Sequence, residues 1–231
     1  MTKHLNHDLD RLKKEMLAMG AMVEEAINQA IRSLVDRDPA LARAVFAGDD
    51  AIDRKELEVE DACLKMLALH QPVAGDLRYI VAVLKVNNDL ERMGDLAQNI
   101  AERALFLATH EPLQVDFDFA RMVATVRRMV SQSLDALVEN DPHLARRVCA
   151  QDDEVDALQR SMFEQLTALM MRDPSTVERA VQVLSVSRHL ERIADSATNI
   201  AEDVVFMVEG ENIRHQPDAA RGVPRYRDTT T

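Results

Sequence analysis

Two segments of the chain, one hundred residues apart, match each other without a gap. The segment LKVNNDLERMGDLAQNIAE (84–102) and the segment LSVSRHLERIADSATNIAE (184–202) are identical at 11 of 19 positions. A second match lies upstream, between DPALARAVFAGDDAID (38–53) and DPHLARRVCAQDDEVD (141–156). Chance similarity between helices rarely preserves so many polar identities, so we interpret the chain as an internal duplication. The duplication predicts one unit over residues 1–111 and a second over 112–211. The remaining tail, 212–231, is expected to be disordered.

Each unit has the pattern of three long helices. Apolar residues recur at spacings of three and four from Leu9 to Leu34, which is the period of a helix with one buried face. Aromatic residues make up only 3% of the chain, whereas helix-forming Ala, Leu, Met, Glu and Arg are abundant. The prolines that divide the chain into six helical segments are Pro39, Pro72, Pro112, Pro142 and Pro174. The prediction is therefore an all-α protein of two tandem, pseudo-symmetric three-helix bundles, with six long antiparallel helices.

The overall charge and hydropathy limit the partners. The formal net charge is −12, and such a surface would be repelled by the phosphates of a nucleic acid. No apolar run approaches the roughly 20 residues that a membrane span requires, and the N-terminus MTKHLNHDLDRLKKE does not resemble a signal peptide. We therefore expect a cytoplasmic protein with no membrane span and no nucleic-acid partner.

Acidic residues form two sets in each repeat, one on the second expected helix and one on the third. The sets are Asp49, Asp50 and Asp53 with Glu91 and Asp95, and then Asp152, Asp153 and Asp156 with Glu191 and Asp195. In an antiparallel hairpin, residues at equal distance from the turn lie at the same height. Asp53 and Glu91 are centred on Pro72. Their counterparts in the second repeat are centred between Asp173 and Pro174, so in both repeats the two acidic sets should converge.

Converging carboxylates repel one another unless protons, basic groups or cations compensate them. An all-oxygen set suits hard cations such as Mg, Ca, Mn or iron, and the lack of matched Cys or His disfavours a thiolate zinc site. A single acidic pair on a helix is more often a solvated face, but duplicated sets meeting on an apolar seam favour metal binding. Glu102 and Glu202 are expected near Arg43 and Arg146, as salt-bridge partners or as ligands. The sequence contains no glycine-rich cradle or arginine cluster for direct phosphate capture.

The segments DLERMGDLAQNIAE (89–102) and HLERIADSATNIAEDVVFMVEGE (189–211) resemble the two signature repeats of the PhoU family. The resemblance covers about residues 5–211, with Met93 and Ala194 standing where the family often has Ile and Gly. It implies multinuclear metal clusters of iron or zinc, with Mg, Mn, Ca or Ni as alternatives, held by the ten carboxylates named above. It further implies a negative regulator that links the ATPase subunit of the phosphate ABC transporter to a sensor histidine kinase, and we expect a homodimer.

Two other functions are compatible with a helical bundle rich in carboxylates. A ferritin-like di-iron oxidoreductase usually needs Glu-x-x-His motifs on two helices, and no Glu of this chain has a His three residues later. Because no nucleophile and base are arranged together either, we expect no enzymatic activity. A metal-free helical scaffold, in which the carboxylates pair only with arginines, is the remaining alternative.

Overall fold

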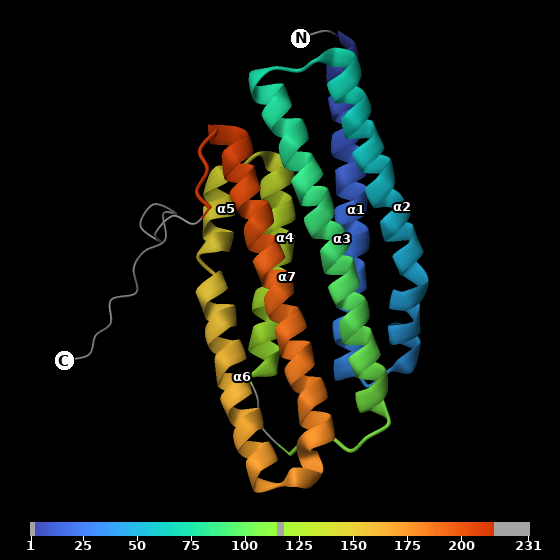
Figure 1. Cartoon of the computed structure of the whole chain (residues 1–231), viewed down its shortest axis with the longest axis vertical. Helices are drawn as coiled ribbons and strands as arrows, with labels where there is room; N and C mark the ends of the chain where they lie inside the picture. Colours follow the sequence, from blue (N-terminus) through green and yellow to red (C-terminus); the bar gives the residue numbers. More distant parts are fainter. Residues whose placement is uncertain (1–2, 115–117, 215–231) are drawn as a thin grey trace, which may run out of the picture.

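The computed structural model of the chain describes residues 3–114 and 118–214, and in these ranges it contains helices and no strand. The predicted all-α class is confirmed (Figure 1). No described helix is long and apolar enough to cross a membrane. The elements are α1 (Lys3–Val35), α2 (Pro39–His70), α3 (Ala74–Ala108), α4 (Phe119–Glu139), α5 (Pro142–Cys149), α6 (Asp152–Arg172), the 3-10 helix η1 (Pro174–Thr176) and α7 (Val177–Glu209).

Aspartate–proline pairs begin helices in both repeats, as their sequence predicts. Asp38 Oδ1 accepts a hydrogen bond of 2.8 Å from the backbone N–H of Ala40, and Pro39 is the first residue of α2. Asp141 caps α5 in the same way, with Pro142 at the first helical position. The cap satisfies a free N–H group, and proline occupies a position whose own N–H has no partner in the helix.

The fifth expected helix is interrupted, whereas its counterpart α2 is continuous. The turn at Ala150 and Gln151 separates α5 from α6. The side-chain amide of Gln151 makes two hydrogen bonds to α4, one through its nitrogen and one through its oxygen. Its Nε2 donates to Gln132 Oε1 at 2.8 Å, and its Oε1 accepts from Arg128 Nε at 2.6 Å. These bonds hold the turn against α4, and α6 then begins with the acidic set Asp152, Asp153 and Glu154, which favours a helix N-terminus.

Helices α3 and α7 run antiparallel through the middle of the molecule, with α1 and α2 on one side and α5 and α6 on the other (Figure 1). The contact between α3 and α7 is the most extensive between any two described elements. Equivalent residues of the two repeats, Leu90 and Leu190 for example, are fully buried in one continuous apolar core. Each such burial stabilises the fold by about 1.5–3 kcal/mol, so the two repeats are held together by their central helices.

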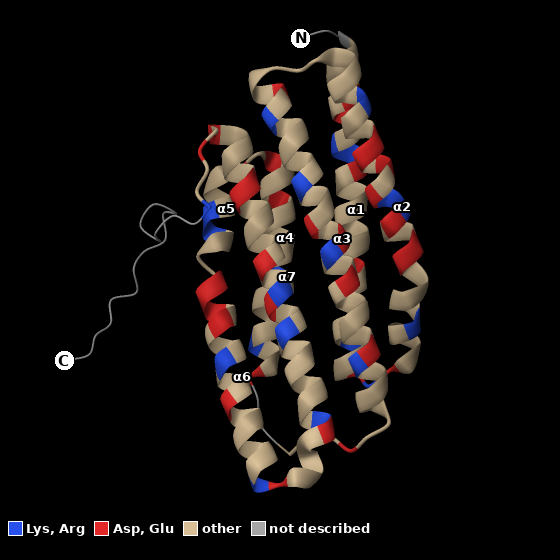
Figure 2. Ribbon diagram, in the orientation of Figure 1, with Lys and Arg blue, Asp and Glu red and all other residues tan. Residues whose placement is uncertain are grey.

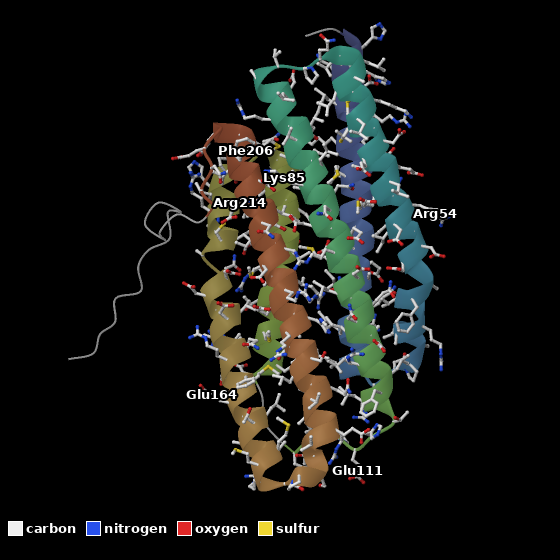
Figure 3. The ribbon with its side chains drawn as sticks, in the orientation of Figure 1. Arg54, Lys85, Glu111, Glu164, Phe206 and Arg214 are labelled. Carbon is white, nitrogen blue, oxygen red and sulfur yellow. The ribbon has the colours of Figure 1, made fainter. Side chains whose placement is uncertain are left out.

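The chain folds back onto the body after α7. Ile213 is fully buried, and Arg214 Nη2 donates to Asp203 Oδ2 at 2.8 Å. Asp203 is itself buried and accepts a second bond from Lys85 Nζ at 3.1 Å. Lys85 also lies 5.3 Å from the ring centre of Phe206. Figure 3 labels Lys85, Phe206 and Arg214 at this end of α3 and α7. Residues 212–214, expected to belong to the tail, therefore pack on the second repeat, and the rest of that tail lies outside the described residues.

Candidate metal centres

The first acidic cluster lies between α2 and α3. Glu91 is half-buried, and burial raises the pKa of its carboxyl, followed by the negative charges of Asp95, Asp53, Glu56 and Asp49. Burial also raises the pKa of Asp95, and Asp49 and Asp53 of the facing helix raise it further. Acids of α2 are thus among the charged neighbours of Glu91 and Asp95 on α3, as the hairpin register predicts.

The second acidic cluster repeats this arrangement between α6 and α7. Burial raises the pKa of Asp152 to about 6, with Asp195 and Asp156 as the next causes. The pKa of Glu191 is raised by burial and then by Asp195, Asp156 and Asp152. The Thr198 hydroxyl donates a bond of 3.2 Å to Asp152 Oδ1 and partly offsets these effects. The carboxylates of this cluster thus face one another across the hairpin, as in the first repeat.

Asp50 and Asp153 stand at the edges of the two clusters. Both are exposed, and the charge of each raises the pKa only of a neighbour on its own helix, Asp53 and Asp152 respectively. Asp50 and Asp153 therefore have the weakest connection to the facing helix among the five predicted carboxylates of each repeat.

Glu56 is a member of the first cluster that the sequence analysis missed. Its charge raises the pKa of Glu91, and its own pKa is raised by burial, then by Glu60 and Asp53. The signal was available, because Glu56 lies three residues after Asp53 on the same helix. Its counterpart in the second repeat is Gln159, so a comparison of the two copies does not reveal it.

The clusters have the donor chemistry of a metal site but not its final geometry. Among the described residues, no group of three or more His, Cys, Asp or Glu side chains lies close enough to hold an ion as the side chains stand. Like charges turn carboxylates apart, and a cation reverses that repulsion. The set consists of carboxylate oxygens, which fits the preference of hard cations, so the chemistry of the residues present suits such an ion.

Basic residues compensate the second cluster more than the first. Arg92 of α3 and Arg192 of α7 both lower the pKa of Asp195, against the larger effects of burial and Asp156, which raise it. No arginine acts on Asp95 in this way. Figure 2 shows basic residues midway along α7, beside α3. Of the two clusters, the first therefore carries the less compensated negative charge.

The expected salt bridge of Glu202 with Arg146 is wrong. Glu202 lies 3.5 Å from Arg214, and Arg146 pairs instead with Glu209 at 2.7 Å. The hairpin rule predicts which residues of α6 and α7 lie level with each other. Arg146 belongs to α5, and the turn at Ala150 interrupts the helix between it and α6, so the rule does not extend to Arg146. In the first repeat Glu102 pairs with the adjacent Arg103 at 2.6 Å.

We expect the substitution Asp152→Asn to stabilise the metal-free chain at neutral pH. The pKa of Asp152 rises from 3.8 to about 6 on folding, so the folded chain binds more protons than the unfolded chain between these values. The free energy of unfolding must then fall as pH rises from about 4 to about 6. Above that range Asp152 is ionised in the folded chain, and the loss of stability is complete. The variant should gain roughly 1–2 kcal/mol at pH 7 and nothing below pH 4.

Urea denaturation with a chelator present, at several pH values between 4 and 7, measures this difference. The matched control is Asp153→Asn at the exposed neighbouring position, which should change stability by less than about 0.5 kcal/mol. Equal stability of Asp152→Asn and the parent chain at pH 7 would contradict the claim that the charged Asp152 carboxylate destabilises the fold.

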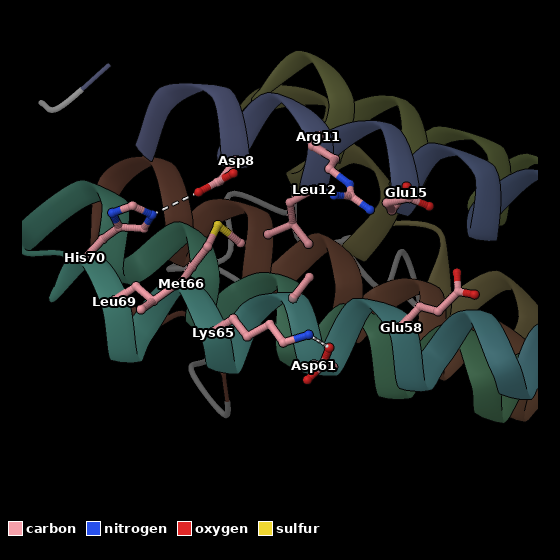
Figure 4. Close-up of a pocket in the computed structure, with 11 residues that line it drawn as sticks. Asp8, Arg11, Leu12, Glu15, Glu58, Asp61, Lys65, Met66, Leu69 and His70 are labelled. Carbon is pink, nitrogen blue, oxygen red and sulfur yellow. Dashed lines mark hydrogen bonds and ion pairs between the residues drawn. The ribbon is translucent and has the colours of Figure 1, made fainter. Parts of the chain in front are cut away.

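A groove of about 500 Å³ lies elsewhere, between α1 and α2 (Figure 4). Two pairs form within it: His70 Nε2 lies 2.9 Å from Asp8 Oδ2, and Lys65 pairs with Asp61. Glu15 and Glu58 of its lining pair with Lys55, and none of the carboxylates predicted to bind metal lines it.

The fold and its two clusters define a duplicated, all-helical protein with one carboxylate-rich site in each half. The family model described as "PhoU domain" matches the chain twice, over residues 16–104 and 119–204. A phosphate-specific transport system accessory protein PhoU homolog of Aquifex aeolicus (strain VF5) is 40% identical over 93% of this chain and 97% of its own length. The crystal structure of PhoU from Pseudomonas aeruginosa superimposes with a TM-score of 0.87 and 37% identity, covering 89% of this chain and 99% of its own.

A more distant solved structure has the same fold. The phosphate transport system regulatory protein PhoU from Streptococcus pneumoniae superimposes with a TM-score of 0.82 at 27% identity, over 90% of this chain and 98% of its own. With both halves matched by the family model and full-length relatives above 30% identity, the chain belongs to the PhoU family.

Proposed function

We propose that the chain is a non-enzymatic negative regulator of phosphate uptake and of the phosphate-starvation response. The observation that carries this proposal is its likeness, along almost its whole length, to proteins named as accessory proteins of phosphate-specific transport. The proposed partners are the ATPase subunit of the phosphate ABC transporter and a sensor histidine kinase. Both present cytoplasmic domains, so the proposed place of action is the cytoplasm.

Metal binding at the two clusters is part of the same proposal. Mutually repelling carboxylates from facing helices, some of them half-buried, support it, since an iron or zinc cluster would relieve their repulsion. The ligands would be Asp49, Asp53, Glu91 and Asp95, with their counterparts Asp152, Asp156, Glu191 and Asp195, and with Asp50 and Asp153 at the edges. A bound ion would neutralise each cluster and tie the second helix of a repeat to its third. The proposed assembly is a homodimer, which light scattering can test.

We expect deletion of the gene to leave phosphate-starvation promoters active in high phosphate. A regulator that restrains the response is needed only when phosphate is plentiful, so its loss should have no effect in low phosphate. A reporter fused to such a promoter, read in both media, measures this. Complementation by the parent chain is the control, and normal repression in the deletion strain would show that the regulatory proposal is wrong.

The two alternatives predict different results in the same strain and in the purified protein. A metal-free scaffold should contain no iron or zinc by elemental analysis yet still complement the deletion. An oxidoreductase of the di-iron type should consume oxygen with a reductant, which the proposed regulator should not.

A further inference from the structure

The contact between α3 and α7 has two ends that the duplication relates to each other. Lys85 of α3 donates to Asp203 of α7 at 3.1 Å. A shift of one hundred residues turns this pair into Ser185 of α7 and Arg103 of α3, and Arg103 Nε does donate to Ser185 Oγ, at 3.4 Å. We call the end with Lys85 and Asp203 the first end and the end with Ser185 and Arg103 the second end.

At the first end the protein supplies its own anions. Asp89 Oδ1 accepts a bond of 3.3 Å from Asn199 Nδ2 across the interface. The buried carboxylate of Asp203 accepts from Lys85 and from Arg214. Lys85 and Arg214 therefore share one carboxylate partner within the chain.

At the second end bases stand where the first end has acids. His189 occupies the position equivalent to Asp89, and Arg103 the position equivalent to Asp203. His189 Nε2 and Ser185 Oγ share a hydrogen bond of 3.1 Å. His189 Nδ1 is buried and has no hydrogen-bond partner within the described residues.

Asn99, the residue equivalent to Asn199, also differs in its hydrogen bond between the two ends. Asn199 reaches across the interface to Asp89, but Asn99 turns back and donates to the main-chain oxygen of Asp95 on its own helix, at 2.8 Å. With His189 opposite instead of an aspartate, no carboxylate remains there for Asn99 to bind.

Basic side chains gather at the second end. Arg103 of α3 reaches Ser185, and Arg192 lies three residues after His189, on the same face of α7. Glu102 is an acid at this end, and it pairs with Arg103 at 2.6 Å. The Glu102 side chain is 62% exposed and can rotate into solvent, whereas Arg103 is 28% exposed and is fixed to the interface by Ser185.

We propose that the second end binds a tetrahedral oxyanion of the phosphate class, in the place that carboxylates hold at the first end. The Arg103 guanidinium can contact two oxygens of the ligand, and the Ser185 hydroxyl can donate to a third. Arg192 adds positive charge nearby. The choice of phosphate among oxyanions rests on the proposed function, whereas the site itself rests on these contacts.

A ligand at this site would connect the two repeats. Arg103 belongs to α3, and Ser185, His189 and Arg192 belong to α7, so a bound oxyanion bridges the central helices. Phosphate concentration would then bias how firmly the two halves are joined, which gives a regulator of phosphate uptake a direct means of responding to its signal.

Isothermal titration of the chelator-treated full chain with inorganic phosphate tests the proposal. We expect saturable binding with a Kd of about 1 mM or tighter and a melting temperature that rises with phosphate. His189→Asp copies the first end by placing a carboxylate beside Arg103, and it should weaken binding at least about tenfold. Arg103→Gln removes the guanidinium and should do the same.

The matched control is Arg160→Gln, at an exposed position on α6, which should bind phosphate like the parent chain. Circular dichroism of each variant checks the fold. Two results would overturn the proposal: no saturable binding by a folded parent chain, or unchanged affinity in both folded site variants. Binding that requires added metal and is lost in Glu191→Ala with Asp195→Ala would assign phosphate to the acidic cluster instead. Because the titration uses purified protein, its failure leaves the reporter test of the regulatory proposal untouched.

Discussion

Replacing Glu91 and Asp95 together by alanine is expected to abolish metal binding at the first repeat while leaving the helices intact. Both carboxylates have raised pKa values caused first by burial and then by neighbouring acids, so their removal relieves repulsion in the metal-free chain. The metal-free variant should be at least as stable as the parent. Elemental analysis after loading with iron or zinc, together with circular dichroism, measures both effects.

The duplication supplies matched controls for this experiment. Glu191→Ala with Asp195→Ala should remove the metal of the second repeat only, and the fourfold variant should bind none. Replacing the exposed Glu139 and Glu164 by alanine removes the same number of charges outside the clusters and should leave metal content unchanged. If helicity falls while the metal is retained, Glu91 and Asp95 have a structural role and the site lies elsewhere.

A chain that ends at Glu211 is expected to be about 4 kcal/mol less stable than one that ends at Arg214. The longer chain keeps the burial of Ile213, a contribution of roughly 2 kcal/mol. It also keeps the ion pair of Arg214 with the buried Asp203, and leaving that carboxylate with Lys85 alone costs roughly 2 kcal/mol more. Urea denaturation of the two truncated chains gives the difference.

Two point variants separate these contributions. Ile213→Ala tests the apolar part and Arg214→Ala the ion pair. Arg146→Ala, which removes a more exposed pair with Glu209, should cost less than about 1 kcal/mol. Equal stability of the two truncated chains would mean that residues 212–214 do not hold the fold, and a truncation after Glu211 would then be safe for functional assays.

The acidic clusters could be predicted from sequence because both of their helices belong to one hairpin. The turn at Pro72 fixes which residues of α2 and α3 lie at the same height, and helical periodicity fixes which face each residue occupies. Asp53 and Glu91 therefore meet as expected, and so do Asp156 and Glu191. Side-chain rotation is not determined by either rule, so the pattern could not give the geometry of an ion site.

The contacts between repeats could not be predicted in this way. Lys85 and Asp203 are separated by more than one hundred residues, and no turn sets their relative height. The register of α3 against α7 depends on how two complete bundles pack through their apolar faces, which is a property of the whole core. For the same reason the sequence shows no arginine cluster, although Arg103 of α3 lies against Ser185 of α7, which bonds to His189, once the two helices are side by side.

The sequence by itself determined the helices, the duplication and the convergence of carboxylates within each hairpin, because these follow from local periodicity, from Asp-Pro caps and from short turns. The tertiary structure alone decided where α5 breaks from α6, how Arg214 is anchored, and what the two ends of the α3–α7 contact contain. Gln151 breaks the helix because its side chain bonds to α4, and Arg214 docks because Asp203 is buried beside it. Such bonds form between segments that only the packed core brings together, so no local pattern encodes them.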